Sequence, residues 1–395
     1  MPPLRRYAES GRPTTKLSSS TARLPACPPA RTVFSWLLLV AAPAIAHSQQ
    51  IPGAVKQNIE ARIATGNSVG IVVGIVNVAG QGFFSHGTRA LRRSQPVDEN
   101  TLYEIGSITK VFTGILLADM VIRGELTLTT PVKDLLPQRV SVPERDGRQI
   151  TLLDLSTHTS GLPRLPSNMS PANRANPYAD YTVRRLYAFL ARHTLRRDVG
   201  SEYEYSNLGV GLLGHALARR AGSSYEDLVV SRIADELDME STRITLSRSR
   251  RARMARGHSN GTEGARWDIP TLAGAGALRS TAADMLRFLS ANLGLTTTGL
   301  ANAMRMSHET RPDIAGPVGL GWHIIEREGS HIVWHNGGTG GYHAFAGFDL
   351  AKRIGVVVLS NSTQSIDDIG LHILDSRNEL LEVTTPSGSV DPSKN

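Results

Sequence analysis

The chain has 395 residues and a formal net charge of +8, so it is long enough to bury the core of one large domain or of two smaller ones. Residues before position 47 supply +5 of this charge, which leaves only +3 for the rest of the chain. A nearly neutral body excludes nucleic-acid binding that is driven by charge alone. We therefore expect no nucleic-acid partner.

Residues 1–46 have the features of a signal peptide. The apolar stretch at residues 33–46 (VFSWLLLVAAPAIA) follows basic residues and ends in Ala44-Ile45-Ala46, a pattern typical of signal-peptidase sites. The stretch is too short to span a bilayer. The sequence thus predicts a periplasmic or secreted protein with no stable membrane span after signal cleavage. Cys27, the only cysteine, lies in this leader, so we expect neither a disulfide nor a thiol nucleophile in the mature chain.

Hydrophobic periodicity after the leader predicts strands near both ends of the chain and helices in its middle. The predicted strands are residues 70–78, 82–86, 331–335, 342–348 and 354–360. The predicted helices are residues 51–65, 107–123, 181–195, 225–237 and 366–381. We expect a polar loop at residues 166–177, and surface or connecting segments at the Arg-rich residues 248–256 and the Gly-rich residues 272–278.

This order of elements predicts an α/β protein of the α+β type, in which N- and C-terminal segments form one antiparallel sheet flanked by helices and a mostly helical lobe is inserted between them. We expect a single domain over residues 47–385. Its sheet would come from about residues 51–105 and 315–385, and its helical lobe from about residues 106–314. The polar residues 386–395 are predicted to form a disordered tail.

Several short motifs do not fit their usual structural context. Ser68 and Ser259 lie in Gly-x-Ser-x-Gly patterns, but neither has a predicted strand before it and a helix after it. Residues 209–214 (GVGLLG) match a dinucleotide-binding fingerprint without the strand that must precede it, so we expect these glycines to allow close helix packing. No His-Glu-x-x-His or cysteine-based metal pattern occurs. We expect no metal and no cofactor.

The stretch YEIGSITKVFTG, at residues 103–114, places Ser107 three residues before Lys110 at the start of an apolar helix. Ser107 could be an N-cap, but a capping box would have Glu or Gln at position 110. A lysine there is disfavoured by the helix dipole by up to about 1 kcal/mol. The spacing brings the amine near the hydroxyl, and the dipole together with burial would lower the lysine pKa. This pair is therefore a candidate nucleophile with its base.

Two further patterns follow in order, and each occurs once in the chain. They are Tyr205-Ser206-Asn207 and His335-Asn336-Gly337, the second at the end of a predicted strand. With the flanking stretches LLDLSTHTSGLP and GGTGGYHAFAGF, the chain from about residue 55 to 380 resembles the serine β-lactamase and penicillin-binding-protein superfamily. It is most similar to the class C β-lactamase-like branch, which includes D-alanyl-D-alanine carboxypeptidases and esterases.

The resemblance implies a catalytic role for three of these residues. Ser107 would attack the substrate carbonyl, while Lys110 and Tyr205 would share general acid and base catalysis. The backbone N–H groups of Ser107 and Gly338 would form the oxyanion hole. For Tyr205 to act as a base, its pKa must fall from about 10, and a nearby Lys110 cation would have this effect.

The resemblance also implies a substrate-binding role for Asn207, His335 and Gly337. The β-lactamases of this family usually have Lys-Thr-Gly at the third motif, whereas this chain has His335. A lysine is a permanent cation for the substrate carboxylate, but a neutral imidazole near pH 7 gives mainly a hydrogen bond. Histidine here resembles the carboxypeptidase and esterase members, which argues against efficient β-lactam hydrolysis.

We therefore expect an exported serine hydrolase that acts through an acyl-enzyme on β-lactams or related cyclic amides and esters. One alternative is a D-alanyl-D-alanine carboxypeptidase or a small-ester esterase. Another is a penicillin-binding protein that deacylates slowly. The expected partner is a small-molecule or peptidoglycan-peptide substrate, and we expect the protein to be a monomer.

Overall fold

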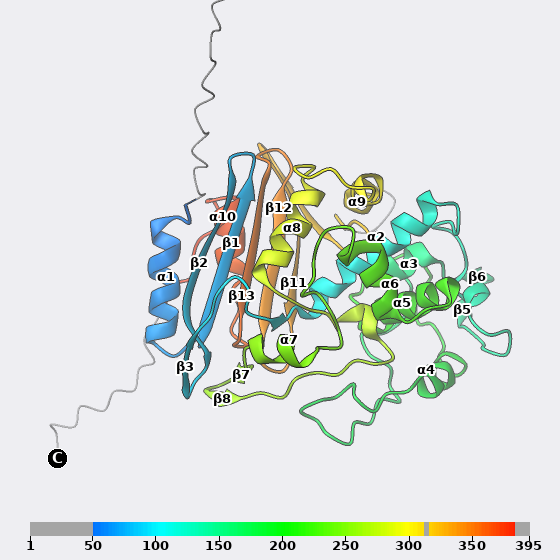
Figure 1. The fold of residues 1–395 in the computed structure, drawn as a ribbon. Helices are drawn as coiled ribbons and strands as arrows, with labels where there is room; N and C mark the ends of the chain where they lie inside the picture. Colours follow the sequence, from blue (N-terminus) through cyan, green and yellow to red (C-terminus); the bar gives the residue numbers. More distant parts are fainter. Residues whose placement is uncertain (1–49, 312–315, 384–395) are drawn as a thin grey trace, which may run out of the picture. The chain divides into compact units, whose positions relative to one another are not determined.

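The computed structural model describes residues 50–311 and 316–383. The predicted signal peptide, Cys27 and the predicted tail at residues 386–395 lie outside these ranges. A seven-stranded antiparallel sheet, in the order β10-β11-β12-β13-β1-β2-β3, joins the two ends of the described chain (Figure 1). Its strands are β1 (Gly70–Asn77), β2 (Gly80–Ala90), β3 (Arg93–Pro96), β10 (His323–Arg327), β11 (Ser330–Gly338), β12 (His343–Asp349) and β13 (Ile354–Ser360).

Both faces of this sheet are apolar, because alternate residues of a strand point to opposite sides. On β1, Ile71 and Val73 pack toward α1 (Gly53–Ala64) and α10 (Asp367–Leu374), whereas Val72 packs toward the rest of the core. Figure 1 shows α1 and α10 on one side of the sheet and α8 (Ala282–Asn292) on the other. Burial on both faces explains why β1 is an almost continuous apolar run.

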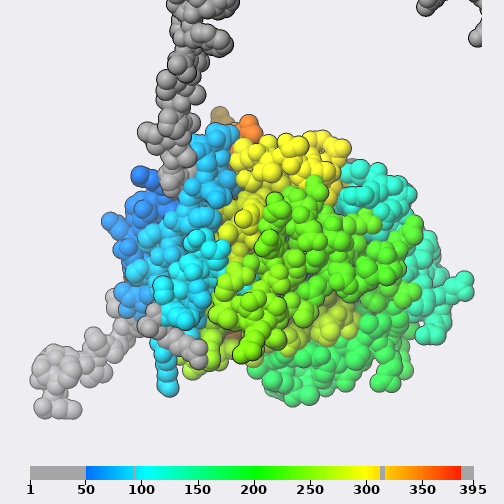
Figure 2. Space-filling model, viewed as in Figure 1, coloured from blue at the N-terminus to red at the C-terminus, as the bar shows by residue number. Residues whose placement is uncertain are grey.

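The middle of the chain forms the expected helical lobe, which is cyan to yellow in Figures 1 and 2. Besides α8, its helices are α2 (Thr109–Ile122), α3 (Leu152–Ser156), α4 (Val183–Leu190), α5 (Asn207–Ala221), α6 (Tyr225–Val229), α7 (Arg248–Arg253) and α9 (Ala301–His308). Two-stranded pairs complete it: β4 (Tyr103–Glu104) with β9 (Arg279–Ser280), β5 (Glu144–Arg145) with β6 (Arg148–Gln149), and β7 (His258–Ser259) with β8 (Thr262–Glu263). Residues Thr109 to Met120 of α2 are all buried, so this helix forms the centre of the lobe. None of the helices in the described ranges is long and apolar enough to cross a membrane.

The structure confirms the predicted strands and corrects several other elements. The helix expected at residues 181–195 is only Val183–Leu190, and the helix expected at 225–237 changes to a π-helix at Val230–Ala234. The helix expected at 366–381 ends at Leu374. Strand β10 was not predicted. Residues 248–253 form helix α7.

The two Gly-rich segments pack against each other. An added Cβ at Gly211 would lie 2.7 Å from Leu272 Cβ, and one at Gly214 would lie 2.8 Å from Gly274 Cα. This contact confirms that the glycines of α5 allow close packing. It also shows that residues 272–278, expected to form a surface or connecting segment, are buried. A short polar-free Gly/Ala run is compatible with either location, so the sequence pattern could not decide between them.

Candidate active site

Ser107 lies in a 3-10 turn, Gly106–Ile108, that leads directly into α2. The N-caps of this turn and of α2 are Ile105 and Ile108, and neither helix start has a side-chain cap bond. The interpretation of Ser107 as an N-cap is therefore wrong. Gly106 has φ +49°, in the left-handed region that glycine tolerates best, and this bend presents the Ser107 side chain to a cavity.

Lys110 is fully buried, and its Nζ lies 2.9 Å from Ser107 Oγ and 2.6 Å from the backbone oxygen of Ala275. In the described ranges no carboxylate forms an ion pair with it. Burial, and secondarily the charge of Arg164, lower the pKa of the Lys110 amine well below its ordinary value. A neutral amine in contact with a hydroxyl can accept its proton.

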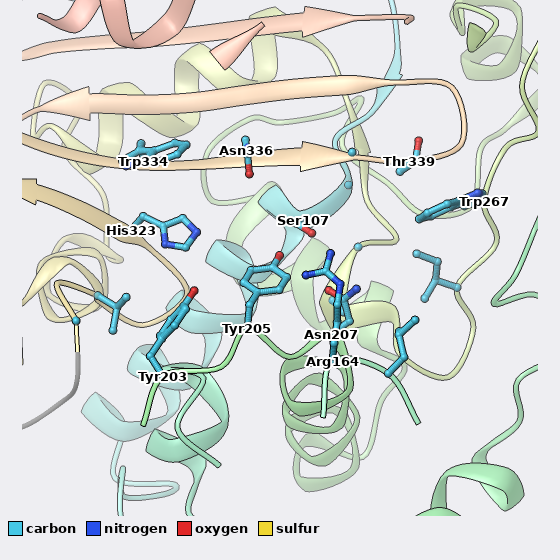
Figure 3. Close-up of a pocket in the computed structure, with 18 of the residues that line it drawn as sticks. Ser107, Arg164, Tyr203, Tyr205, Asn207, Trp267, His323, Trp334, Asn336 and Thr339 are labelled. Atoms are coloured by element: carbon cyan, nitrogen blue, oxygen red, sulfur yellow. The ribbon is translucent and has the colours of Figure 1, made fainter. Parts of the chain in front are cut away.

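Tyr205 lies in the loop before α5, and its phenol points toward Ser107 (Figure 3). Lys110 Nζ lies over the ring, 4.8 Å from its centroid. Burial raises the pKa of Tyr205, while the contact with the Ser107 hydroxyl opposes this effect. The expected lowering of the Tyr205 pKa is therefore wrong, because desolvation of the phenolate outweighs the favourable contacts.

A loop that sequence reasoning did not assign to the site holds Tyr205 in place. The His158 ring packs against Tyr205 with centroids 4.5 Å apart, and its Nδ1 accepts a hydrogen bond from the Ser206 N–H at 3.0 Å. The Ser206 hydroxyl in turn donates to Pro163 O at 2.7 Å. These bonds fix the segment HTSGLP to the Tyr-x-Asn motif. The signal for this role was the quoted LLDLSTHTSGLP stretch, but only the fold shows which motif it supports.

Asn207, the first residue of α5, lines the cavity. Its Nδ2 donates to the Tyr178 hydroxyl at 3.2 Å, while its buried Oδ1 finds no hydrogen-bond partner in the part of the chain that the structure describes. Buried polar atoms are normally paired. The Asn207 carbonyl oxygen is thus an acceptor available to an N–H group of a ligand.

The end of β11 passes close to the Ser107 turn. A Cβ added to Gly337 would lie 2.0 Å from Ile105 O and 2.9 Å from Ser107 N, and one added to Gly106 would lie 2.9 Å from Gly338 N. Only glycine at positions 106 and 337 permits this approach. The backbone N–H groups of Ser107 and Gly338 are thereby brought to the same end of the cavity.

His335 is buried on β11, with 1% of its surface exposed, and it does not line the cavity. Its Nδ1 donates to Asn336 O at 2.5 Å, and its ring centroid lies 4.8 Å from that of His323 and 6.1 Å from that of Tyr205. Burial, followed by the nearby His323 and Lys110, lowers the pKa of His335 well below its ordinary value. The imidazole is therefore neutral and provides no cation for a substrate.

The cavity in front of Ser107 has a volume of about 820 Å³, and its wall is mostly apolar and aromatic (Figure 3). Lining residues that sequence reasoning missed include Arg164, Tyr178, Tyr203, Trp267, His323 and Trp334. They come from loops or from β10 and β11, which converge only in the fold. Over residues 50–311 and 316–383, no group of three or more His, Cys, Asp or Glu side chains is placed to hold a metal ion.

Comparison with solved structures defines the class of the protein. The chain matches a class C β-lactamase from Rhodobacter sphaeroides with a TM-score of 0.69 and 27% identity, over 82% of this chain and 100% of that one. It also matches a β-lactamase/D-alanine carboxypeptidase from Pseudomonas syringae with a TM-score of 0.71 and 23% identity, over 82% and 98% of the two chains. The fold is that of the class C β-lactamases.

Sequence comparison then gives the family. The profile of the Beta-lactamase family matches residues 55–374. The D-alanyl-D-alanine-carboxypeptidase/endopeptidase AmpH of Escherichia coli K12 is 30% identical over 280 residues, which is 66% of this chain and 71% of that protein. A β-lactamase of the same strain is 25% identical over 368 residues, 84% of this chain and 94% of that protein. The chain belongs to the Beta-lactamase family and is a serine hydrolase.

Proposed function

We propose that this protein hydrolyses amide or ester bonds through an acyl-enzyme on Ser107. The observation that carries this proposal is the contact between the fully buried Lys110 amine and the Ser107 hydroxyl at 2.9 Å. A neutral amine takes the proton from Ser107 Oγ as the oxygen attacks the substrate carbonyl. The N–H groups of Ser107 and Gly338 stabilise the resulting oxyanion.

Tyr205 serves as the proton donor to the leaving group in this mechanism. Its raised pKa keeps the phenol protonated at neutral pH, which favours a donor over a tyrosinate base. Tyr205 gives its phenolic proton to the departing nitrogen or oxygen, and the phenolate then recovers a proton from the Lys110 ammonium, whose Nζ lies 4.8 Å from the centroid of the Tyr205 ring. Asn207 Oδ1 accepts a hydrogen bond from an N–H group of the substrate.

The substrates that we propose are β-lactams and peptides ending in D-alanyl-D-alanine, with small esters as a further group. Peptides ending in D-alanyl-D-alanine are favoured over β-lactams because His335 is buried and neutral. It therefore lacks the positive charge of the lysine that β-lactamases usually have at this position. These peptides are also favoured by the 30% identity to a carboxypeptidase/endopeptidase. We further propose that residues 1–46 are a cleaved signal peptide and that the mature enzyme acts in the periplasm or outside the cell as a monomer.

Intact-mass measurement after mixing with a penicillin tests the mechanism. A lasting adduct indicates slow deacylation, and rapid turnover of the penicillin indicates a β-lactamase. If neither an adduct nor turnover is found, the substrates are peptides or esters. The variants Ser107→Ala and Lys110→Ala should lose the adduct and at least about a thousandfold in kcat/KM. Full activity of Ser107→Ala on every substrate that the wild type accepts would show that another residue is the nucleophile.

A further inference from the structure

The described residues that line the cavity in front of Ser107 bring one permanent charge to it. Among its described lining residues, Arg164 is the only Lys, Arg, Asp or Glu side chain. His323 also lines the cavity, but burial lowers its pKa to about 4, so it is neutral at neutral pH. An aromatic, apolar cavity with a single guanidinium is suited to a ligand with one negative charge.

Arg164 is positioned for contact with a ligand that is bound at Ser107. Its guanidinium carbon lies 5.0 Å from the centroid of the Tyr205 ring, and its head group points into the cavity between Tyr205 and Asn207 (Figure 3). Its backbone oxygen accepts a hydrogen bond from Leu208 N at 3.2 Å, which ties it to the Tyr-x-Asn motif. In the described ranges no side chain forms an ion pair or a hydrogen bond with the guanidinium.

We infer that Arg164 binds a carboxylate of the substrate. The preferred substrates are therefore amides or esters that carry a carboxylate. This inference rests on the proposed acyl-enzyme reaction at Ser107. The sheet-edge position that would hold a lysine carries the buried, neutral His335 instead. The loop residue provides the positive charge from another side of the cavity, where five N–H donors in a planar fork match the two carboxylate oxygens.

The same charge has a second effect on the catalytic pair. Arg164 is the largest cause after burial that lowers the pKa of Lys110. The other groups that face Lys110 are the imidazoles of His158, His323 and His335 and the phenol of Tyr205, all neutral at neutral pH. Loss of the Arg164 charge should therefore raise the pKa of Lys110 and move the acidic limb of the pH profile of kcat/KM to higher pH.

Two matched substrate pairs test the inference and locate the carboxylate. The first pair compares the p-nitrophenyl monoester of glutaric acid, which carries the carboxylate on the acyl part, with the neutral p-nitrophenyl pentanoate. The second pair compares a peptide ending in D-alanyl-D-alanine, which carries the carboxylate on the leaving group, with its C-terminal amide. In Arg164→Gln, the ratio of kcat/KM for the acid to that for its neutral match should fall by about ten- to a hundredfold in at least one pair. Arg164→Lys should restore part of this ratio, and the pair that responds identifies the end of the substrate.

The controls separate this inference from the mechanism beneath it. Arg192→Gln removes an exposed arginine that does not line the cavity and should leave both ratios unchanged. If Ser107→Ala is inactive while Arg164→Gln changes neither ratio nor the pH profile, the mechanism stands and the role of Arg164 is refuted. If Ser107→Ala keeps the wild-type activity, or if the wild type hydrolyses none of the four substrates and is neither acylated by a penicillin nor able to hydrolyse it, the proposed function fails and the inference fails with it.

Discussion

Replacing Lys110 with methionine should separate the stability of this protein from its activity. Methionine has a similar length and can fill the buried space without a polar head. The change removes the hydrogen bonds of Nζ to Ser107 Oγ and Ala275 O. It also removes a group whose charged form is disfavoured by burial. Activity should fall by at least about a thousandfold, because Ser107 loses its base.

The effect on stability depends on pH in a defined direction. Each lost hydrogen bond costs about 0.5–1.5 kcal/mol. Against this, the lowered pKa of Lys110 costs the wild type stability. Below the folded-state pKa, where Lys110 is protonated in both the folded and the unfolded state, each unit of lowering costs about 1.4 kcal/mol. In the unfolded chain the lysine keeps its proton up to about pH 10.4, whereas the folded state releases it at lower pH. Between these two pKa values the wild-type free energy of unfolding rises by about 1.4 kcal/mol per pH unit, and that contribution is absent in Lys110→Met.

Urea denaturation of both proteins between about pH 7 and about pH 10 measures this difference. The free energy of unfolding of Lys110→Met minus that of the wild type should decrease as the pH rises. Lys133→Met removes a solvent-exposed lysine and is the matched control, for which the difference should stay constant. Parallel curves for Lys110→Met and the wild type across the whole range would mean that Lys110 is charged in the folded state, and they would refute its assignment as a neutral base.

Two further predictions concern a close backbone contact at the active site and a buried ion pair. Gly337→Ala places a methyl 2.0 Å from Ile105 O and should lower kcat/KM at least about a hundredfold and stability by about 1–3 kcal/mol. The control Gly338→Ala places a methyl with nothing within 4 Å and should leave stability near that of the wild type. Equal denaturation midpoints for the two variants would contradict this prediction. Arg62→Met breaks the buried 2.5 Å ion pair with Asp368 and should cost about 3–5 kcal/mol of stability in chemical denaturation, without changing activity per folded molecule; the double variant Arg62→Met/Asp368→Leu should recover part of the loss.

The sequence was sufficient to predict the elements that carry a strong local pattern. The apolar strands β1 and β13 were located within a residue or two, because their β-branched runs are buried on both faces and need little tertiary information. The pair Ser107 and Lys110 was also predictable, because a lysine at the start of an apolar helix conflicts with the dipole rule and so indicates a special environment. The contact distance between the two groups agrees with that reasoning.

The remainder of the site depends on contacts between distant parts of the chain. The pKa of Tyr205 could not be predicted from the proximity of a lysine, because the decisive quantity is the desolvation of the phenol in the finished fold. The role of residues 158–164 was hidden for a similar reason. Their hydrogen bonds to residues 204–208 span more than forty positions of sequence and leave no local periodicity. The position of Trp267 could not be predicted for the same reason, because its backbone N–H donates to the Glu104 carboxylate at 3.0 Å, and the two residues are far apart in the sequence.

Histidine at position 335 limits the number of amines in the buried layer around Lys110. A lysine at position 335 would bring a second amine into this layer, which already contains Lys110, His323 and Tyr205. When protonated, that amine would be a buried cation with no carboxylate among its described neighbours, in conflict with the cost of burying an unpaired charge. The neutral imidazole avoids this conflict, but it leaves the strand edge without a charge for an anionic substrate. Under our proposal, that charge is provided by Arg164 at the cavity wall, where solvent reduces the cost of keeping a guanidinium ionised.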